Sequence, residues 1–167
     1  MKEVFIDQIQ QWFEESVTKD EDRMSKFYQS LDEGDAQEVQ NQLTRILGQT
    51  ISILDTKARN EEKENFYHGM MLGLLRNHRS WIVKSNVESG DGFADIIIKP
   101  EDPDKGMIIE LKYSKTFAGL EKACEDAIEQ IQDRRYEEIL REEGRDHILA
   151  YGIAFCKKRC KIVLQKI

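Results

Sequence analysis

Three short apolar segments follow one another between residues 81 and 114, and they constrain the fold of this chain more than any other feature. Their sequences are WIVKSNVES, FADIIIKP and MIIELKYS, separated by the turn sequences SGDG and EDPDKG. Segments of this length, rich in Ile and Val and bounded by Gly, Pro and Asp, are typical of β-strands. Because the connections are short, we expect an antiparallel meander of three strands.

Helical periodicity appears on both sides of these strands. Apolar residues recur at helical spacing through residues 1–60 and again at about 62–77, where Gly69 and Gly73 would let another backbone approach closely. After the strands, the spacing predicts one long helix from about Thr116 to Glu142, followed by the strands HILAYGIAF and CKIVLQKI. We therefore expect an α/β fold, with a mixed sheet of four or five strands flanked by helices.

The chain has 167 residues, which suits one domain or one domain with an attached piece. The stretch Lys57–Lys63 is polar and charged, as expected of a junction between two parts. We therefore expect a helical linker or packing segment at residues 1–60 and a second domain at residues 61–167.

Charged residues interrupt two of the predicted strands. Asp95 lies in an apolar run, and Glu110 and Lys112 interrupt the next strand. Burying an unpaired carboxylate is costly, so each carboxylate needs a partner. Since residues two apart share a face of a strand, Glu110 and Lys112 point the same way, and Asp95 can lie beside them if the strands pair.

This combination of side chains has a chemical logic. Mg²⁺ prefers carboxylate oxygens, so Asp95 and Glu110 on adjacent strands can hold one ion against a phosphate. A metal ion polarises the phosphoryl oxygen and lowers the pKa of a bound water. Lys112 can orient or deprotonate that water and offset developing negative charge. The residues thus predict a metal-dependent phosphodiester hydrolase.

The chain also resembles the PD-(D/E)XK nuclease superfamily, and within it a bacterial family in which such a domain follows an ATPase-like domain of the AAA class. The resemblance covers residues 62–167 and rests on five segments, FYHGMMLGLL, ESGDGFADIIIKP, IIELK, AIEQIQDRRY and YGIAFCKKRC. It implies a restriction-endonuclease-like core, with residues 1–60 resembling the helical linker between the two domains. The proline of the superfamily motif is absent, because Phe93 and Ala94 precede Asp95.

The resemblance also implies roles for individual residues. Asp95 and Glu110 would be ligands of Mg²⁺ or Mn²⁺, and the backbone carbonyl of Leu111 would reach the same ion. Lys112 would be the catalytic lysine.

Two helices would add to this site by the same resemblance. Some members of the superfamily supply a glutamate from the first core helix, and Glu64 fits that position best, ahead of Glu61 and Glu62. Other members place a glutamine on the helix after the lysine, and Gln130 fits. Tyr136 belongs to the same segment, but lies further round the helix.

Charge and composition leave alternatives open. The net charge of −7 counts against a non-specific nucleic-acid coat, since duplex binding depends on neutralising phosphates. For an active nuclease, DNA is favoured over RNA as the partner. The alternative is a silent nuclease-like module that binds a partner or nucleic acid and regulates an ATPase-like domain. A third hypothesis is a purely structural interaction domain. The oligomeric state is not predicted.

The location of the protein is also suggested by composition. No apolar run approaches the ~20 residues needed to cross a bilayer, so we expect no membrane partner. The N-terminal segment is acidic and amphipathic, unlike a signal peptide. The three cysteines, Cys124, Cys156 and Cys160, have no metal-type spacing and suit ordinary thiols in a reducing compartment. We therefore expect a cytoplasmic protein.

Overall fold

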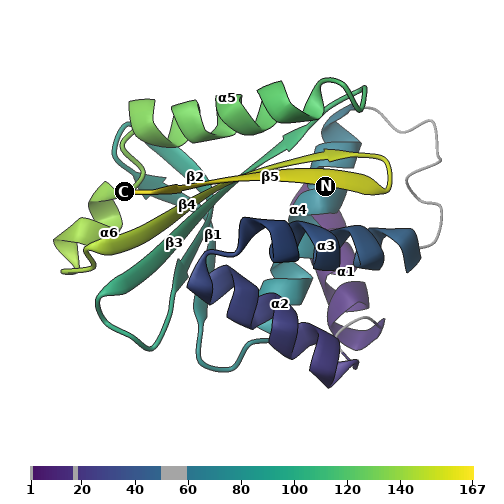
Figure 1. Ribbon diagram of the computed structural model, residues 1–167, viewed down its shortest axis with the longest axis horizontal. Helices are drawn as coiled ribbons and strands as arrows, with labels where there is room; N and C mark the ends of the chain where they lie inside the picture. The colour runs from purple at the N-terminus through teal and green to yellow at the C-terminus, as the bar shows by residue number, and fades with distance from the viewer. Residues whose placement is uncertain (1, 17–18, 50–59) are drawn as a thin grey trace.

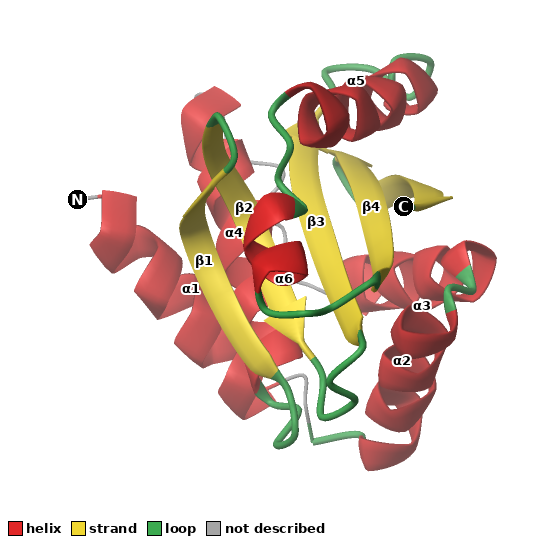
Figure 2. Ribbon diagram, turned by 90° about the vertical axis from the view of Figure 1, so that its left-hand side faces the viewer, coloured by secondary structure: helices red, strands yellow, loops and turns green. Residues whose placement is uncertain are grey.

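A computed structural model of the chain describes residues 2–16, 19–49 and 60–167. A five-stranded sheet has helices α1 to α4 on one face and α5 and α6 on the other, as Figures 1 and 2 show. The expected α/β architecture is therefore confirmed. The elements in chain order are α1 (Lys2–Ser16), α2 (Glu21–Glu33), α3 (Ala36–Gln49), α4 (Asn60–Arg76), β1 (Ile82–Ser89), β2 (Gly92–Lys99), β3 (Lys105–Tyr113), α5 (Leu120–Asp133), α6 (Glu138–Glu142), β4 (His147–Cys156) and β5 (Arg159–Lys166).

The strands are ordered β1-β2-β3-β4-β5 across the sheet. β1 pairs antiparallel with β2, and β2 with β3, so the predicted meander is confirmed. β4 runs parallel to β3 after the chain crosses over through α5, and β5 returns antiparallel to β4. The sheet is mixed, and its one parallel pair brings the carboxyl ends of β3 and β4 to the same edge.

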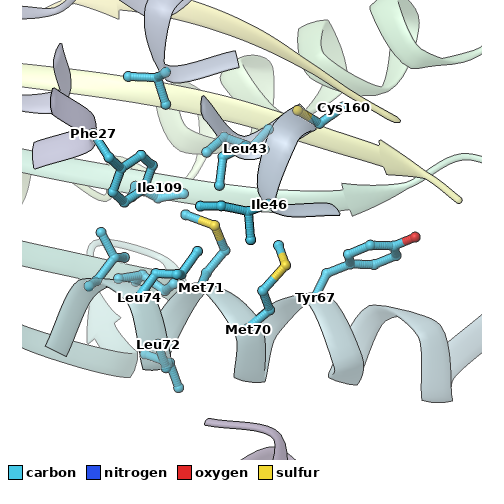
Figure 3. Packing of buried hydrophobic residues seen from close by; sticks show 14 of the residues in the cluster. Phe27, Leu43, Ile46, Tyr67, Met70, Met71, Leu72, Leu74, Ile109 and Cys160 are labelled. Carbon is cyan, nitrogen blue, oxygen red and sulfur yellow. The ribbon is translucent and has the colours of Figure 1, made fainter. Parts of the chain in front are cut away.

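The larger core lies between the sheet and the N-terminal helices. Figure 3 shows how side chains from different elements meet there: Phe27 of α2, Leu43 and Ile46 of α3, Met70 of α4 and Ile109 of β3. Helices before residue 60 thus share one core with the strands after it. The division into parts at 1–60 and 61–167 stays a prediction.

Two glycines of α4 allow α1 to pack closely. A Cβ atom at Gly69 would lie 2.8 Å from the carbonyl oxygen of Ile6, and one at Gly73 would lie 2.5 Å from that of Gln10. Both distances are too short for a side chain, so the backbones of the two helices touch through these positions. The close approach expected from the sequence is confirmed, and its partner is α1.

The expectation of one helix from residue 116 to 142 is wrong. The structure has α5 and α6 with a turn between them, in which Arg135 has a φ of 53°. The guanidinium of Arg135 donates to both carboxylate oxygens of Asp91, each at 3.1 Å, and Gly90 lies against the backbone of Arg134. The helix ends because this turn packs on the β1–β2 turn, a partner far away in the sequence.

Helical spacing is predicted through residue 60, and the structure describes α3 as far as Gln49. The apolar residues Ile51 and Leu54, which continue the predicted pattern, lie outside the described residues. Within the described ranges, every helix is too short or too polar to span a membrane.

The hydroxyl of Tyr151 ties β4 to α2. It is fully buried and donates to the carbonyl oxygen of Leu31 at 2.6 Å, in the last turn of α2. Tyr151→Phe should lower the free energy of unfolding by about 1–2 kcal/mol, because a buried carbonyl loses its short hydrogen bond. Urea unfolding measures this loss. The control is Tyr113→Phe, because the side chain of Tyr113 is only half-buried, and it should lower the free energy of unfolding by less. Equal losses of stability in the two variants would contradict the prediction.

Candidate active site

The ladder between β1 and β2 is distorted where Asn86 faces Asp95. Pairs on both sides keep one register, but this pair is missing, and Asn86 has a φ of 52°. Ile96 packs against the N-terminal helices, whereas Ala94 packs with α5 and α6. Regular alternation would place Ala94 and Ile96 on one face, so β2 turns over at Asp95.

The same residue lies where β2 and β3 separate. Their backbone pairing ends at Ile96 and Ile109, and Asp95 and Glu110 come directly beyond it. In this β2–β3 opening, the Leu111 amide donates to Oδ2 of Asp95 at 2.9 Å, and the Asp95 amide donates to Oε2 of Glu110 at 3.4 Å. Carboxylates therefore bond the backbone groups that the ladder leaves free, which fixes both side chains in the opening.

Gln130 of α5 connects the two charged residues of β3. Its amide nitrogen donates to Oε1 of Glu110 at 2.6 Å, and its Oε1 accepts from Nζ of Lys112 at 2.5 Å. Lys112 Nζ also lies 3.6 Å from Oε1 of Glu110. Glu110 and Lys112 thus point the same way, as expected, and α5 supplies the amide that holds both.

A glycine beside Glu110 brings α5 within reach. Gly152 of β4 pairs with Glu110, and a Cβ atom there would lie 2.5 Å from the carbonyl oxygen of Cys124 in α5. The missing side chain lets α5 lie low on the sheet. Gln130, less than two turns further along the helix, can then reach into the site.

Tyr136 also reaches this cluster, which the sequence did not predict. Its hydroxyl lies 3.1 Å from the amide nitrogen of Gln130, which donates to it. An unbroken helix would have turned Tyr136 away, but the chain leaves the helix before Arg135 and brings the ring back. Tyr136 was not predicted to lie here because the sequence predicted a helix that continues through Arg135, where the structure has a turn.

The carboxyl of Glu110 lies in an unusual electrostatic environment. Glu110 is only 3% exposed to solvent. Burial first, and the charge of Asp95 second, raise the pKa of this carboxyl to about 8, while Lys112 acts in the opposite direction. Two carboxylates therefore lie together, with the ammonium of Lys112 beside Glu110, an arrangement that a divalent cation would stabilise.

The donor set fits such a cation. Mg²⁺ keeps several waters and binds through one or two carboxylates, so Asp95 and Glu110, with the carbonyl of Leu111, suffice. Among the residues that the structure describes, no third His, Cys, Asp or Glu joins them.

Glu64 is therefore not brought to the cluster in this structure. Its side chain is exposed on α4, one turn before His68, whose Nε2 lies 2.8 Å from Oγ of Ser85 in β1. Glu62 is exposed as well, and the side chain of Glu61 lies outside the described part of the chain. The role of Glu64 as a metal ligand stays a prediction.

The burial of Glu110 predicts a pH-dependent effect of Glu110→Gln in metal-free protein. Because the folded-state pKa is raised, the penalty for the charged form is absent below the ordinary value of 4.5, grows as pH rises, and is complete above about 8. In EDTA at pH 9, Glu110→Gln should therefore be more stable than the parent protein by about 1–3 kcal/mol.

Urea unfolding at pH 5 and pH 9 measures this difference. Glu129→Gln, at an exposed position on α5, is the control, and its stability relative to the parent protein should be the same at both pH values. A Glu110→Gln difference that is the same at both pH values would count against the buried, raised-pKa carboxyl.

Comparison with protein families matches residues 62–165 to the PD-(D/E)XK nuclease superfamily. The match covers more than half of the chain and extends from α4 into β5, so it includes the whole cluster just described. The chain therefore belongs to the PD-(D/E)XK nuclease superfamily, and its mixed sheet with flanking helices is consistent with a restriction-endonuclease-like fold. No curated protein matches the chain.

Proposed function

We propose that this chain is a metal-dependent nuclease that hydrolyses phosphodiester bonds in DNA or RNA. The observation that carries the proposal is the cluster in the β2–β3 opening, where Asp95, Glu110 and Lys112 lie together with Gln130. Superfamily membership supports the same chemistry.

In this proposal, Asp95, Glu110 and the Leu111 carbonyl hold Mg²⁺ or Mn²⁺. When bound, the ion polarises a phosphoryl oxygen and lowers the pKa of a water. Because burial raises the pKa of Glu110, its carboxyl would have to give up its proton to the solvent in order to hold the ion.

Lys112 supplies the fixed positive charge of the site. Its Nζ is held between Gln130 and Glu110, so it can donate to a phosphate oxygen or to the attacking water without searching for a position. Gln130 is a positioning residue, since it acts on the phosphate only through Lys112 and Glu110. Asp95, bonded to the Leu111 amide, keeps its carboxylate at the opening.

Finer parts of the proposal rest on the resemblance or on composition. DNA is favoured over RNA, and Glu64 is a further ligand from α4. Residues 61–167 form the nuclease domain, which an ATPase-like domain accompanies in a longer protein. The cytoplasmic location rests on the thiols, all three of which are free and buried: Cys124, Cys156 and Cys160.

A second candidate function is a silent nuclease-like module that binds a partner or nucleic acid and regulates an ATPase-like domain. The observation that favours it is that Gln130 already satisfies both Glu110 and Lys112, so the cluster is a closed hydrogen-bond network without a substrate. Such a network can stabilise a fold without catalysis.

Cleavage of plasmid, linear DNA and RNA with Mg²⁺ or Mn²⁺ tests the proposal, alongside cation binding by calorimetry. Asp95→Asn should abolish cleavage, since an amide keeps the hydrogen bond from Leu111 but loses the charge. Asp133→Asn, at the exposed end of α5, should cleave like the parent protein.

The outcomes separate the two functions. Cleavage that EDTA and Asp95→Asn both abolish supports the nuclease. Absence of cleavage, with cation binding that depends on Asp95, favours the silent module. Cleavage that survives Asp95→Asn would contradict the assignment of the site.

A further inference from the structure

Cations gather at the edge of the sheet where β3 and β4 end. Lys63 of α4 donates to the hydroxyl of Tyr113, the last residue of β3, at 3.2 Å. The hydroxyl of Tyr67 donates to the carbonyl oxygen of Lys157 at 2.7 Å, which fixes the β4–β5 turn on α4. Figure 1 shows this turn, the start of α4 and the loop into α5 at the same end of the sheet. We call this group the basic edge; its members are Lys63, Lys115, Lys157, Lys158 and Arg159.

Three cations of the basic edge act on one buried thiol, that of Cys156. Burial raises the pKa of Cys156, and the positive charges of Lys157, Lys63 and Arg159 act in the opposite direction. Residues from α4 and from the β4–β5 turn therefore form one positive region in an otherwise acidic chain.

The charges of the basic edge also differ from other cations of the described chain in their ion pairing. Within the described parts of the chain, none of its members forms an ion pair with a carboxylate. At the opposite edge, by contrast, Lys99 and Arg145 both pair with Glu143, and Lys105 pairs with Asp32. A cluster of cations without an ion pair among the described residues, in a chain of net charge −7, is an attractive site for phosphates.

The basic edge continues directly from the catalytic cluster. Lys112 pairs with Ala154, Tyr113 pairs with Phe155, and Cys156 pairs with Arg159 across the next ladder. Since a strand rises about 3.3 Å per residue, the cations begin within roughly 10 Å of Lys112. If the reacting phosphate of a nucleic-acid strand lay at Lys112, the neighbouring phosphates of that nucleic acid would thus reach the basic edge.

An exposed aromatic ring lies in the same region. Phe117, in the loop between β3 and α5, is 47% exposed, and the guanidinium of Arg159 lies 4.4 Å from its ring centroid. An exposed aromatic ring beside a group of cations is a stacking platform for a base. Bases in a duplex are already stacked and paired, so the base that uses such a platform must be unpaired.

We propose that the basic edge binds the single-stranded part of a nucleic-acid substrate, with its phosphates on Lys63, Lys157 and Arg159 and one unpaired base stacked on Phe117. The inference rests on the proposed nuclease function and specifies its substrate: a single strand, or a duplex with a single-stranded end.

Fluorescence anisotropy with a labelled 20-nucleotide oligo(dT) and a blunt duplex of equal length tests the proposal, in EDTA so that neither probe is cut. The single strand should bind about tenfold more tightly than the duplex. Phe117→Ala should weaken single-strand binding about tenfold. Lys157→Ala should weaken binding to both probes and reduce the salt dependence.

Two control variants lie at the opposite edge. Ile82→Ala removes an exposed apolar side chain at the start of β1, and Arg79→Ala removes an exposed cation just before it. Both should bind like the parent protein. The proposal is overturned if the duplex binds as tightly as the single strand, or if Phe117→Ala binds like Ile82→Ala.

The cleavage assay separates this inference from the proposed function. Metal-dependent cleavage with no loss of single-strand preference in Phe117→Ala would overturn the inference and leave the nuclease intact. Single-strand binding that depends on Phe117, without cleavage of any probe, would overturn the nuclease and retain the binding surface.

Discussion

Lys112→Met is expected to lose about 10²- to 10³-fold of the cleavage rate while still binding Mg²⁺. The substitution keeps the length of the side chain but removes the one cation that lies between Glu110 and Gln130, so charge developing on the phosphate loses its fixed counter-charge. The two carboxylates remain in place. Initial rates at saturating Mg²⁺, on the substrate that the parent protein cuts best, measure the loss.

The matched control for this prediction is Lys84→Met, which removes an exposed lysine of β1. It should leave the rate unchanged. Calorimetry and urea unfolding distinguish a catalytic role of Lys112 from a structural one. A Lys112→Met rate within fivefold of the parent would contradict the catalytic role, and loss of Mg²⁺ binding together with the rate would make Lys112 a structural member of the cluster.

Gly152→Ala is expected to lower the free energy of unfolding by about 3 kcal/mol. The new Cβ atom would lie 2.5 Å from the carbonyl oxygen of Cys124 and 3.1 Å from side-chain atoms of Ala127 and Ile128, so α5 must move off the sheet. Since backbone atoms cannot yield as a flexible side chain can, the whole helix carries the strain. Gln130 would then move away from Glu110, and cleavage should fall as well.

The same substitution at Gly48 provides the control with the opposite sign. Gly48 lies in α3, and among the described residues nothing apart from its chain neighbours and the backbone of its own helix lies within 4 Å of a Cβ atom built there. Gly48→Ala should therefore gain up to about 1 kcal/mol from helix propensity. Urea unfolding of both variants measures the contrast, and a Gly152→Ala protein as stable as the parent would contradict the close approach of α5.

The sequence predicted the centre of the candidate site because its signal is local. A carboxylate inside an apolar strand needs a partner, and this rule alone singles out Asp95 and Glu110, while strand alternation adds Lys112. Gln130 came from the superfamily resemblance, since a glutamine on a helix carries no signal of its own. The structure brings these four side chains together.

Features that depend on distant partners were not predictable in this way. The helix ends near Arg135 because that residue binds Asp91, 44 positions earlier. The basic edge combines side chains near residues 63, 115 and 158, so no basic stripe appears along the sequence. The distortion at Asn86 has only the weak signal that Asn tolerates a positive φ.

The separation of β2 from β3 has a consequence for how substrate choice can change over time. Beyond Ile96, the β1–β2 hairpin is held by contacts with the α5–α6 turn and not by the β2–β3 ladder: Ser89 donates to the Tyr136 carbonyl oxygen, the Asp91 amide donates to the Arg134 carbonyl oxygen, and the Asp91 carboxylate pairs with Arg135. Substitutions at these contacts can widen or narrow the β2–β3 opening without changing Asp95, Glu110 or Lys112. Under the proposed nuclease function, selection can therefore adjust the shape of the accepted nucleic acid separately from the chemistry.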